Sequence, residues 1–151
     1  MKPGDRAPDF ELPDVNGRLC TLSGLLAQGP VVLFFYPAAM TPGCTAQSCH
    51  FRDLAAEFET LGAQRVGISA DTVQRQKHFS DTYAFDYPLL SDADGLVARA
   101  YGVKRGFGLP SKRTTFVIAS DGRILDVIRS ELNMQVHADR ALQVLGENAK
   151  R

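Results

Sequence analysis

The sequence predicts an α/β fold of three layers around a mixed central sheet. Residues 31–36 form a continuous apolar run rich in β-branched and aromatic side chains, which is typical of a strand buried on both faces. Strand and helix patterns alternate through most of the chain, and two strands joined by a tight turn and a last helix follow them. This order favours helices on both sides of a sheet that contains parallel and antiparallel strands.

The first elements form a predicted N-terminal β-hairpin. An alternating segment at 9–12 and a return strand at 19–22 flank Asn16-Gly17, a pair that favours a tight turn. Ser23 is expected to cap a short helical turn that follows the return strand. The hairpin and this turn therefore precede the central strand.

A long amphipathic helix is expected after the central strand. Pro37 ends the strand, and Pro42 suits a first helical turn because it has no backbone N–H to leave unpaired. Apolar residues recur at helical spacing up to Leu61, so one helix is predicted over 42–61. The later elements are predicted to be a strand at 65–69, a helix at 71–83, an extended segment at 88–91, a helix at 92–101, strands at 114–119 and 123–129, and a helix at 138–147.

Length and charge restrict the kind of protein. The 151 residues fit one domain, 1–151, and the 17 basic residues balance 17 acidic ones, so no nucleic-acid partner is expected. The longest strongly apolar run is six residues, whereas a membrane span needs about 20. No signal peptide is recognisable at the start of the chain. We expect a cytoplasmic protein without a membrane partner.

The chain has three cysteines, Cys20, Cys44 and Cys49, and an odd number of cysteines cannot all pair in disulfides within one chain. Cys44 follows the central strand and falls in the first turn of the predicted helix, where free backbone N–H groups and the helix dipole favour a thiolate. Because the thiolate is the reactive form of cysteine, Cys44 is the candidate nucleophile. Cys20 is expected to be a buried residue without a chemical role.

Cys49 lies on the same predicted helix as Cys44, five positions further on. In an intact helix this spacing gives a Cα–Cα distance of about 8–9 Å. A disulfide needs about 4.4–6.8 Å. The pair can therefore join only if the start of the helix unwinds, which would couple oxidation to local unfolding.

The segment around Cys44 resembles peroxiredoxins. Pro37-x-x-x-Thr41-x-x-Cys44 matches their active-site motif, and the run from Phe35 through Thr45 to Asp53 is similar to the bacterioferritin-comigratory, or peroxiredoxin Q, branch. Further matching segments are Gly67-Ile68-Ser69-x-Asp71, Tyr87-Pro88-Leu89-Leu90-Ser91-Asp92, Tyr101-Gly102-Val103 and Arg113-Thr114-Thr115-Phe116-Val117-Ile118.

The resemblance implies a thioredoxin-like fold and a thiol-dependent peroxidase that reduces hydrogen peroxide and organic hydroperoxides. It gives Cys44 the role of peroxidatic cysteine and Cys49 that of resolving cysteine. Arg113 would contact the peroxide and the thiolate, Thr41 would hydrogen-bond near the sulfur, and Pro37 would shield the site from water. No cofactor or metal is implied, and thioredoxin or a similar carrier would restore the thiols. Such a protein can work as a monomer or a weak homodimer.

One departure and two alternatives accompany this resemblance. Relatives often carry glutamate where this chain has Gln47, so the usual carboxylate beside Arg113 is replaced by an amide. A thiol–disulfide oxidoreductase would share the fold, but its cysteines are normally two residues apart. A metallochaperone of thioredoxin-like fold could use Cys44, Cys49 and His137 as ligands, although the Cys49-His50 neighbourhood matches no familiar zinc spacing.

Overall fold

Strand β3 (Val31–Phe35) lies at the centre of the structure, a computed structural model that describes residues 1–106 and 109–150. All five of its side chains are fully buried, as the apolar run predicts. The sheet has the order β5–β4–β3–β6–β7, with β3, β4 and β5 parallel and with β6 and β7 antiparallel to their neighbours. The other strands are β4 (Gln64–Ser69), β5 (Leu89–Ser91), β6 (Thr114–Ile118) and β7 (Ile124–Arg129).

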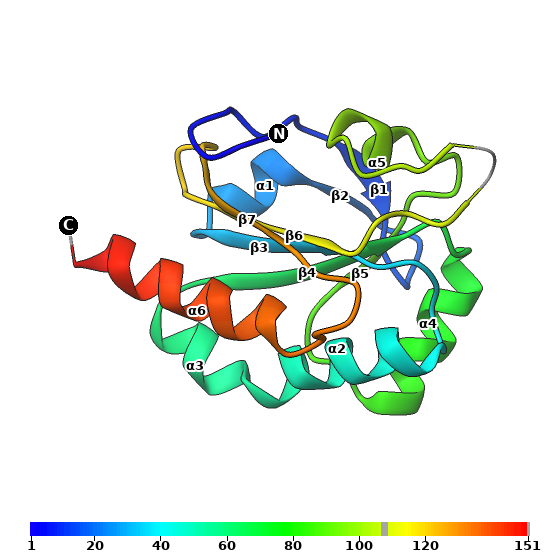
Figure 1. Cartoon of the computed structure of the whole chain (residues 1–151). Coiled ribbons are helices and arrows are strands. Elements are labelled where there is room, and N and C mark those ends of the chain that lie inside the picture. Colours follow the sequence, from blue (N-terminus) through cyan, green and yellow to red (C-terminus); the bar gives the residue numbers. More distant parts are fainter. Residues whose placement is uncertain (107–108, 151) are drawn as a thin grey trace.

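The two faces of the sheet pack against separate sets of elements (Figure 1). Alternate β3 side chains point to opposite faces, so Phe34 joins one core cluster and Phe35 the other. On the Phe34 side lie α2 (Pro42–Asp53), α3 (Ala55–Thr60), α4 (Val73–Tyr83) and α6 (Val136–Ala149). On the Phe35 side lie α1 (Leu22–Leu26), α5 (Leu96–Ala100) and the hairpin of β1 (Glu11–Pro13) and β2 (Leu19–Thr21). The predicted three layers, mixed sheet and N-terminal hairpin are confirmed.

The helical turn after the hairpin is capped by a different residue from the one predicted. Thr21, not Ser23, accepts a hydrogen bond from the backbone N–H of Gly24 at 3.0 Å. Thr21 has an extended backbone because it also ends β2, and an extended residue is what an N-cap requires. The backbone N–H of Ser23 instead donates to the carboxylate of Asp9 at 3.0 Å.

The single helix predicted over 42–61 is wrong, because the helix breaks at Leu54 into α2 and α3. A continuous helix would bond the Phe51 carbonyl to the N–H four residues later. That carbonyl accepts instead from Arg65 Nη1 at 2.8 Å. The Arg65 guanidinium is itself held by the carboxylate of Asp86 and lies over the ring of Tyr87. A contact from β4 therefore sets where α2 ends.

Two further helices differ from prediction at their ends. The helix expected over 92–101 begins at Leu96, because Asp92 stays outside and its carboxylate accepts the N–H groups of Val97 and Ala98. The last helix extends two residues beyond the predicted range at each end.

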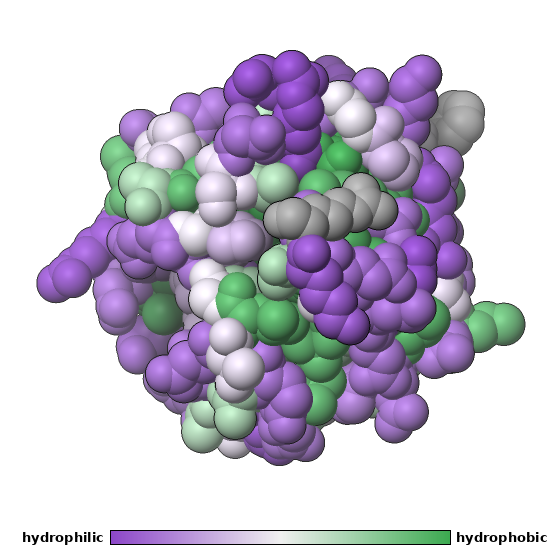
Figure 2. Space-filling model, turned by 90° about the vertical axis from the view of Figure 1, so that its left-hand side faces the viewer, coloured by the Kyte–Doolittle hydropathy of each residue, from purple (hydrophilic) through white to green (hydrophobic). Residues whose placement is uncertain are grey.

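On the side of the molecule shown in Figure 2, hydrophilic side chains dominate and hydrophobic ones form smaller patches. In the part of the chain that the structure describes, no helix is long and apolar enough to cross a membrane.

Candidate active site

Cys44 lies in the first turn of α2, where the sequence places it. Thr41 is the N-cap residue, with an extended backbone, and its carbonyl accepts the N–H of Thr45 at 2.9 Å. Pro42 begins the helix without an unpaired donor of its own. The side chain of Cys44 has no exposed surface and belongs to the Phe34-side core. The thiol therefore sits at the positive end of a helix and away from bulk water.

Arg113, 69 positions away in the sequence, reaches the same point from the segment before β6. Its Nη2 lies 3.5 Å from Cys44 Sγ, and its Nη1 donates to the amide oxygen of Gln47. The arginine is only 6% exposed, and its backbone N–H donates to the carboxylate of Glu131 at 3.0 Å. The structure thus brings together Cys44 and Arg113, as the resemblance implies, and uses Gln47 to orient the guanidinium.

Among the hydrogen-bond partners of this buried guanidinium, only one is ionisable. Among the described residues Arg113 makes no ion pair with a carboxylate, and its amide partner Gln47 is neutral. A buried cation is costly unless an anion faces it. The group that can supply that anion among its hydrogen-bond partners is the sulfur of Cys44. The structure therefore places a fixed positive charge 3.5 Å from the sulfur of Cys44.

Two buried donors at the site have no hydrogen-bond partner among the described residues: Arg113 Nε and Gln47 Nε2. Buried polar atoms without partners are uncommon and often indicate a ligand or a functional role. A peroxide offers two acceptor oxygens of suitable size. The donors beside Cys44 therefore match the needs of a small oxygen-rich substrate.

Gly43 keeps the guanidinium close to the helix start. A Cβ atom at this position would lie 3.2 Å from Arg113 Nη2 and 3.4 Å from Cε of Met134. The absence of a side chain thus lets Arg113 and Met134 approach the backbone next to Cys44. Met134, in the segment between β7 and α6, was not identified from the sequence, which gives no signal for it.

Thr41 and Pro37 occupy the loop that leads into α2. The Thr41 hydroxyl donates to the carbonyl of Ala38 at 2.7 Å, so in this structure it closes the loop and does not bond the sulfur. Pro37 is half-buried and lines a cavity of about 330 Å³ together with Asp71, Lys104 and Pro110. Both residues therefore lie close to Cys44 along the chain, and their contacts are to the loop and to its neighbours.

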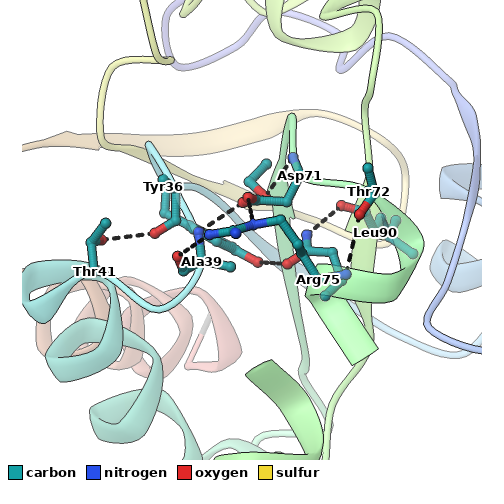
Figure 3. Close-up of polar contacts among 10 residues, drawn as sticks. Tyr36, Ala39, Thr41, Asp71, Thr72, Arg75 and Leu90 are labelled. Atoms are coloured by element: carbon teal, nitrogen blue, oxygen red, sulfur yellow. Dashed lines mark hydrogen bonds and ion pairs between the residues drawn. The ribbon is translucent and has the colours of Figure 1, made fainter. Parts of the chain in front are cut away.

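The same loop is held by Asp71, which precedes α4, and by Arg75, in the first turn of α4 (Figure 3). Neither residue was assigned to the site from the sequence. Asp71 accepts the N–H of Ala39 at 2.7 Å, and Arg75 donates to the carbonyl of Ala39 at 3.3 Å. Asp71 and Arg75 also form an ion pair at 3.0 Å. Next to Ala39, Met40 has φ of 68°, a left-handed conformation that costs a non-glycine residue about 1–2 kcal/mol. In the sequence, the only indication of a role for Asp71 is that it belongs to one of the segments that resemble peroxiredoxins.

Cys49 is partly buried on α2 and is a free thiol, like Cys20 and Cys44. Burial raises the pKa of Cys49, with a smaller opposing effect from the nearby Arg52 cation. The Cys49 side chain therefore ionises less readily than an ordinary cysteine. Because α2 is continuous over both residues, their Cα atoms are about 8–9 Å apart, too far for a disulfide.

Three long-range contacts hold the second half of α2 in place. The Tyr87 hydroxyl donates to the Ser48 carbonyl at 2.7 Å, Arg65 bonds the Phe51 carbonyl, and the His50 ring bonds Asp139 of α6 at 2.7 Å. No comparable side-chain bond to the backbone of residues 42–47 is present among the described residues. Side chains from other elements therefore bond the backbone in the second half of α2, whereas the first turns are contacted through the side chains of Cys44 and Gln47.

His137, at the start of α6, is fully buried and uses both ring nitrogens inside the protein. Nε2 lies 2.9 Å from the Ser130 carbonyl and Nδ1 lies 2.8 Å from the Thr115 hydroxyl. A carbonyl can only accept, so Nε2 carries the proton and Nδ1 accepts from Thr115. Neither nitrogen is free for a metal, which argues against the ligand set of the metallochaperone alternative.

Burial lowers the pKa of His137, with a further contribution from the Arg113 cation, against opposing effects of Ser130 and Glu131. The unfolded chain therefore takes up a proton near the ordinary value of about 6.5 while the folded protein does not. We expect the free energy of unfolding to fall as the pH drops below about 6.5. Denaturant titrations at several pH values should show a smaller decline for His137→Gln than for the exposed-site control His78→Gln. Equal declines in both variants would contradict this expectation.

With the geometry established, comparison with known proteins shows the family. The model described as the AhpC/TSA family matches residues 3–127. The chain belongs to this family. A Mycobacterium tuberculosis protein named "Putative peroxiredoxin Rv1608c" is 61% identical over 148 residues, which is 96% of each chain. The crystal structure of peroxidoxin BcpB from Mycobacterium tuberculosis has a TM-score of 0.95 at 60% identity and covers 100% of this chain and 99% of that one.

The branch is shown by a second solved structure. The bacterioferritin comigratory protein of Xanthomonas campestris, studied for its alkyl peroxide reduction activity, is 33% identical with a TM-score of 0.84, and the match covers 93% of this chain and 92% of that one. The resemblance to peroxiredoxins of this branch and the thioredoxin-like fold are thus confirmed. The protein is a thiol peroxidase. This family assignment does not support the two alternatives, a thiol–disulfide oxidoreductase and a metallochaperone.

Proposed function

We propose that Cys44 is the peroxidatic and Cys49 the resolving cysteine of this peroxiredoxin. The observation that carries the proposal is the contact between Arg113 Nη2 and Cys44 Sγ, 3.5 Å apart and both buried. It joins a fixed cation and a sulfur that a helix start already favours as an anion. A nucleophile and a group that stabilises developing negative charge are what peroxide cleavage requires.

The reaction follows from this arrangement. The Cys44 thiolate attacks one oxygen of the peroxide, the O–O bond breaks, and the leaving oxygen departs as hydroxide or alkoxide and takes a proton. Arg113 and the free donor of Gln47 are placed to stabilise the charge on that oxygen. Cys44 becomes a sulfenic acid, the Cys49 thiol displaces its oxygen as water, and a disulfide forms. Two thiols are oxidised and one peroxide is reduced.

Thr41 and Pro37 support this chemistry from the loop before α2. We propose that Pro37 restricts water at the sulfur and that the Thr41 hydroxyl, which bonds Ala38, turns toward the peroxide when it binds. Hydrogen bonds of catalytic groups commonly tighten only in the complex with substrate. Both residues act in the loop that positions Cys44.

The substrates and partners are proposed from the same geometry. Hydrogen peroxide and organic hydroperoxides share the O–O group that the site addresses, and thioredoxin or a similar dithiol carrier would reduce the disulfide by exchange. Since both cysteines lie on one helix, a monomer can complete the cycle. The free thiols suit a reducing compartment such as the cytoplasm. We propose that residues 1–151 act as one domain in this cycle.

Intact mass spectrometry after one equivalent of hydrogen peroxide tests the assignment. The wild-type protein should lose two hydrogens, Cys49→Ser should gain one oxygen as a trapped sulfenic acid, and Cys44→Ser should stay unchanged. Cys20→Ser is the matched control and should behave as wild type, with thioredoxin restoring its starting mass. Rapid oxidation of Cys44→Ser would remove Cys44 from the proposed role.

A further inference from the structure

We infer that Asp71 and Arg75 are positioning residues of the reduced active site, which act by clamping the peptide groups of Ala39 on the loop that leads to Cys44. The inference rests on the proposed function, because it concerns how Cys44 is placed for attack. Asp71 lies in the segment between β4 and α4, and Arg75 lies in the first turn of α4, so both are outside the helix that carries the cysteines. Figure 3 shows the two side chains directed toward Ala39.

The clamp holds both sides of one residue. Asp71 Oδ2 accepts the N–H of Ala39 at 2.7 Å, and Arg75 Nη2 donates to the carbonyl of Ala39 at 3.3 Å. The ion pair between Asp71 Oδ1 and Arg75 Nε, at 3.0 Å, fixes the two side chains relative to each other. Ala39 is thus bound through both of its polar backbone groups by one ion pair.

The carboxylate is itself held from the sheet. Asp71 Oδ2 also accepts the Ser69 hydroxyl at 2.6 Å, and the Asp71 side chain is only 9% exposed. Ser69 ends β4, and next to it the strand carbonyl of Ile68 accepts the N–H of Tyr36, the residue before Pro37. A chain of bonds therefore runs from the central sheet through Asp71 to the loop.

The clamp matters because the next residue is in a costly conformation. Met40 has φ of 68° and is 37% exposed. A non-glycine residue keeps such a conformation only when the surrounding structure fixes it. Thr41 follows, closes the loop onto Ala38 and begins α2. Without the hold on Ala39, the loop can relax toward ordinary conformations, and the start of α2 with Cys44 shifts with it.

Two alanine variants on α4 test this function with a matched control. Arg75→Ala and Lys77→Ala each remove an exposed cation from an ion pair between residues four apart, but only Arg75 touches the loop. In the Cys49→Ser background we expect Arg75→Ala to lower the rate constant for hydrogen peroxide by at least about tenfold, since small misplacements of reacting groups are costly. Lys77→Ala should stay within about twofold. Equal rate constants in the two variants would overturn the inference.

Rescue at Met40 separates positioning from general destabilisation. Glycine adopts positive φ without strain, so Met40→Gly removes the need for the clamp. We expect Arg75→Ala combined with Met40→Gly to react within about threefold of Met40→Gly alone. A tenfold loss that persists in the glycine background would overturn the inference.

A measurement without peroxide keeps this inference distinct from the proposed function. In the reduced protein, hydrogen exchange of the Ala39 amide should accelerate at least about tenfold in Asp71→Asn and Arg75→Ala and stay unchanged in Lys77→Ala. If exchange follows this pattern but the wild-type protein does not react with peroxide, the clamp stands and the proposed function fails. Unchanged Ala39 exchange in a wild type that does react leaves the function in place and overturns the clamp.

Discussion

Replacing Arg113 with methionine is expected to slow the reaction of Cys44 with hydrogen peroxide by about 10²–10³-fold. Loss of one donor aimed at a developing oxyanion has an effect of this size in other enzymes. Here the same substitution also removes the counter-charge of the thiolate, because Arg113 Nη2 is the cationic donor at Cys44 Sγ. Stopped-flow measurement of sulfenic acid formation in the Cys49→Ser background gives the rate constant directly.

A neighbouring arginine supplies the control. Arg105 pairs with the same Glu131 carboxylate that accepts the Arg113 backbone N–H, but it is 39% exposed. Arg105→Met should therefore change the rate constant by less than about twofold, as surface charges are screened by water. If Arg113→Met reacts within fivefold of wild type, the guanidinium does not stabilise the transition state and the assignment of Arg113 fails.

The stability of Arg113→Met must be measured in parallel. The substitution leaves the Gln47 amide oxygen buried without its donor, which costs about 1–3 kcal/mol. Arg113→Lys separates the two effects, since lysine keeps the charge but lacks the planar fork that reaches Cys44 and Gln47 together. We expect Arg113→Lys to recover part of the rate and to remain slower than wild type.

The second large effect is expected in the oxidised protein. Formation of the Cys44–Cys49 disulfide must unwind the first turns of α2, because an intact helix keeps the two Cα atoms about 8–9 Å apart. Hydrogen exchange of the amides in 43–49 should rise on the order of a hundredfold on oxidation. The end of α2 should stay protected, since Tyr87 and Arg65 hold the carbonyls of Ser48 and Phe51.

Two controls make this result specific to the disulfide. Cys49→Ser treated with peroxide carries oxidised Cys44 but no disulfide, and its α2 amides should stay protected. The amides of α4 should not change in either protein and serve as an internal reference. Unchanged protection of 43–49 in the fully oxidised wild type would show that the disulfide forms without unwinding.

The sequence was informative where local pattern and chemistry coincide. A six-residue apolar run predicted the fully buried strand β3, and the turn after it placed Cys44 at a helix start. The Cys44–Cys49 spacing predicted, from helix geometry alone, that a disulfide between the two residues is incompatible with an intact α2. Such features depend on residues close together in the chain, so they can be read without knowing the fold.

Other features depend on partners far apart in the sequence. The break at Leu54 escaped prediction because it depends on Arg65 taking the Phe51 carbonyl, a contact that no helical pattern contains. The helix cap was assigned to Ser23 because the local residue types allow either hydroxyl, whereas the end of β2 selects Thr21. Tertiary contacts decide between alternatives that are locally equivalent.

The same distinction between local features and long-range contacts applies to the active site. By itself the sequence predicted Cys44 as the candidate nucleophile, the position of Cys49 on the same helix and the three-layer fold, because periodicity and the helix start are local properties. Only the tertiary structure decided that Arg113 stands at 3.5 Å from the sulfur, that Gln47 orients it, and that Asp71 and Arg75 hold the loop at Ala39. The physical reason is that these contacts join residues at or just before the starts of β6, α2 and α4, and their distances exist only once the sheet has brought those elements together.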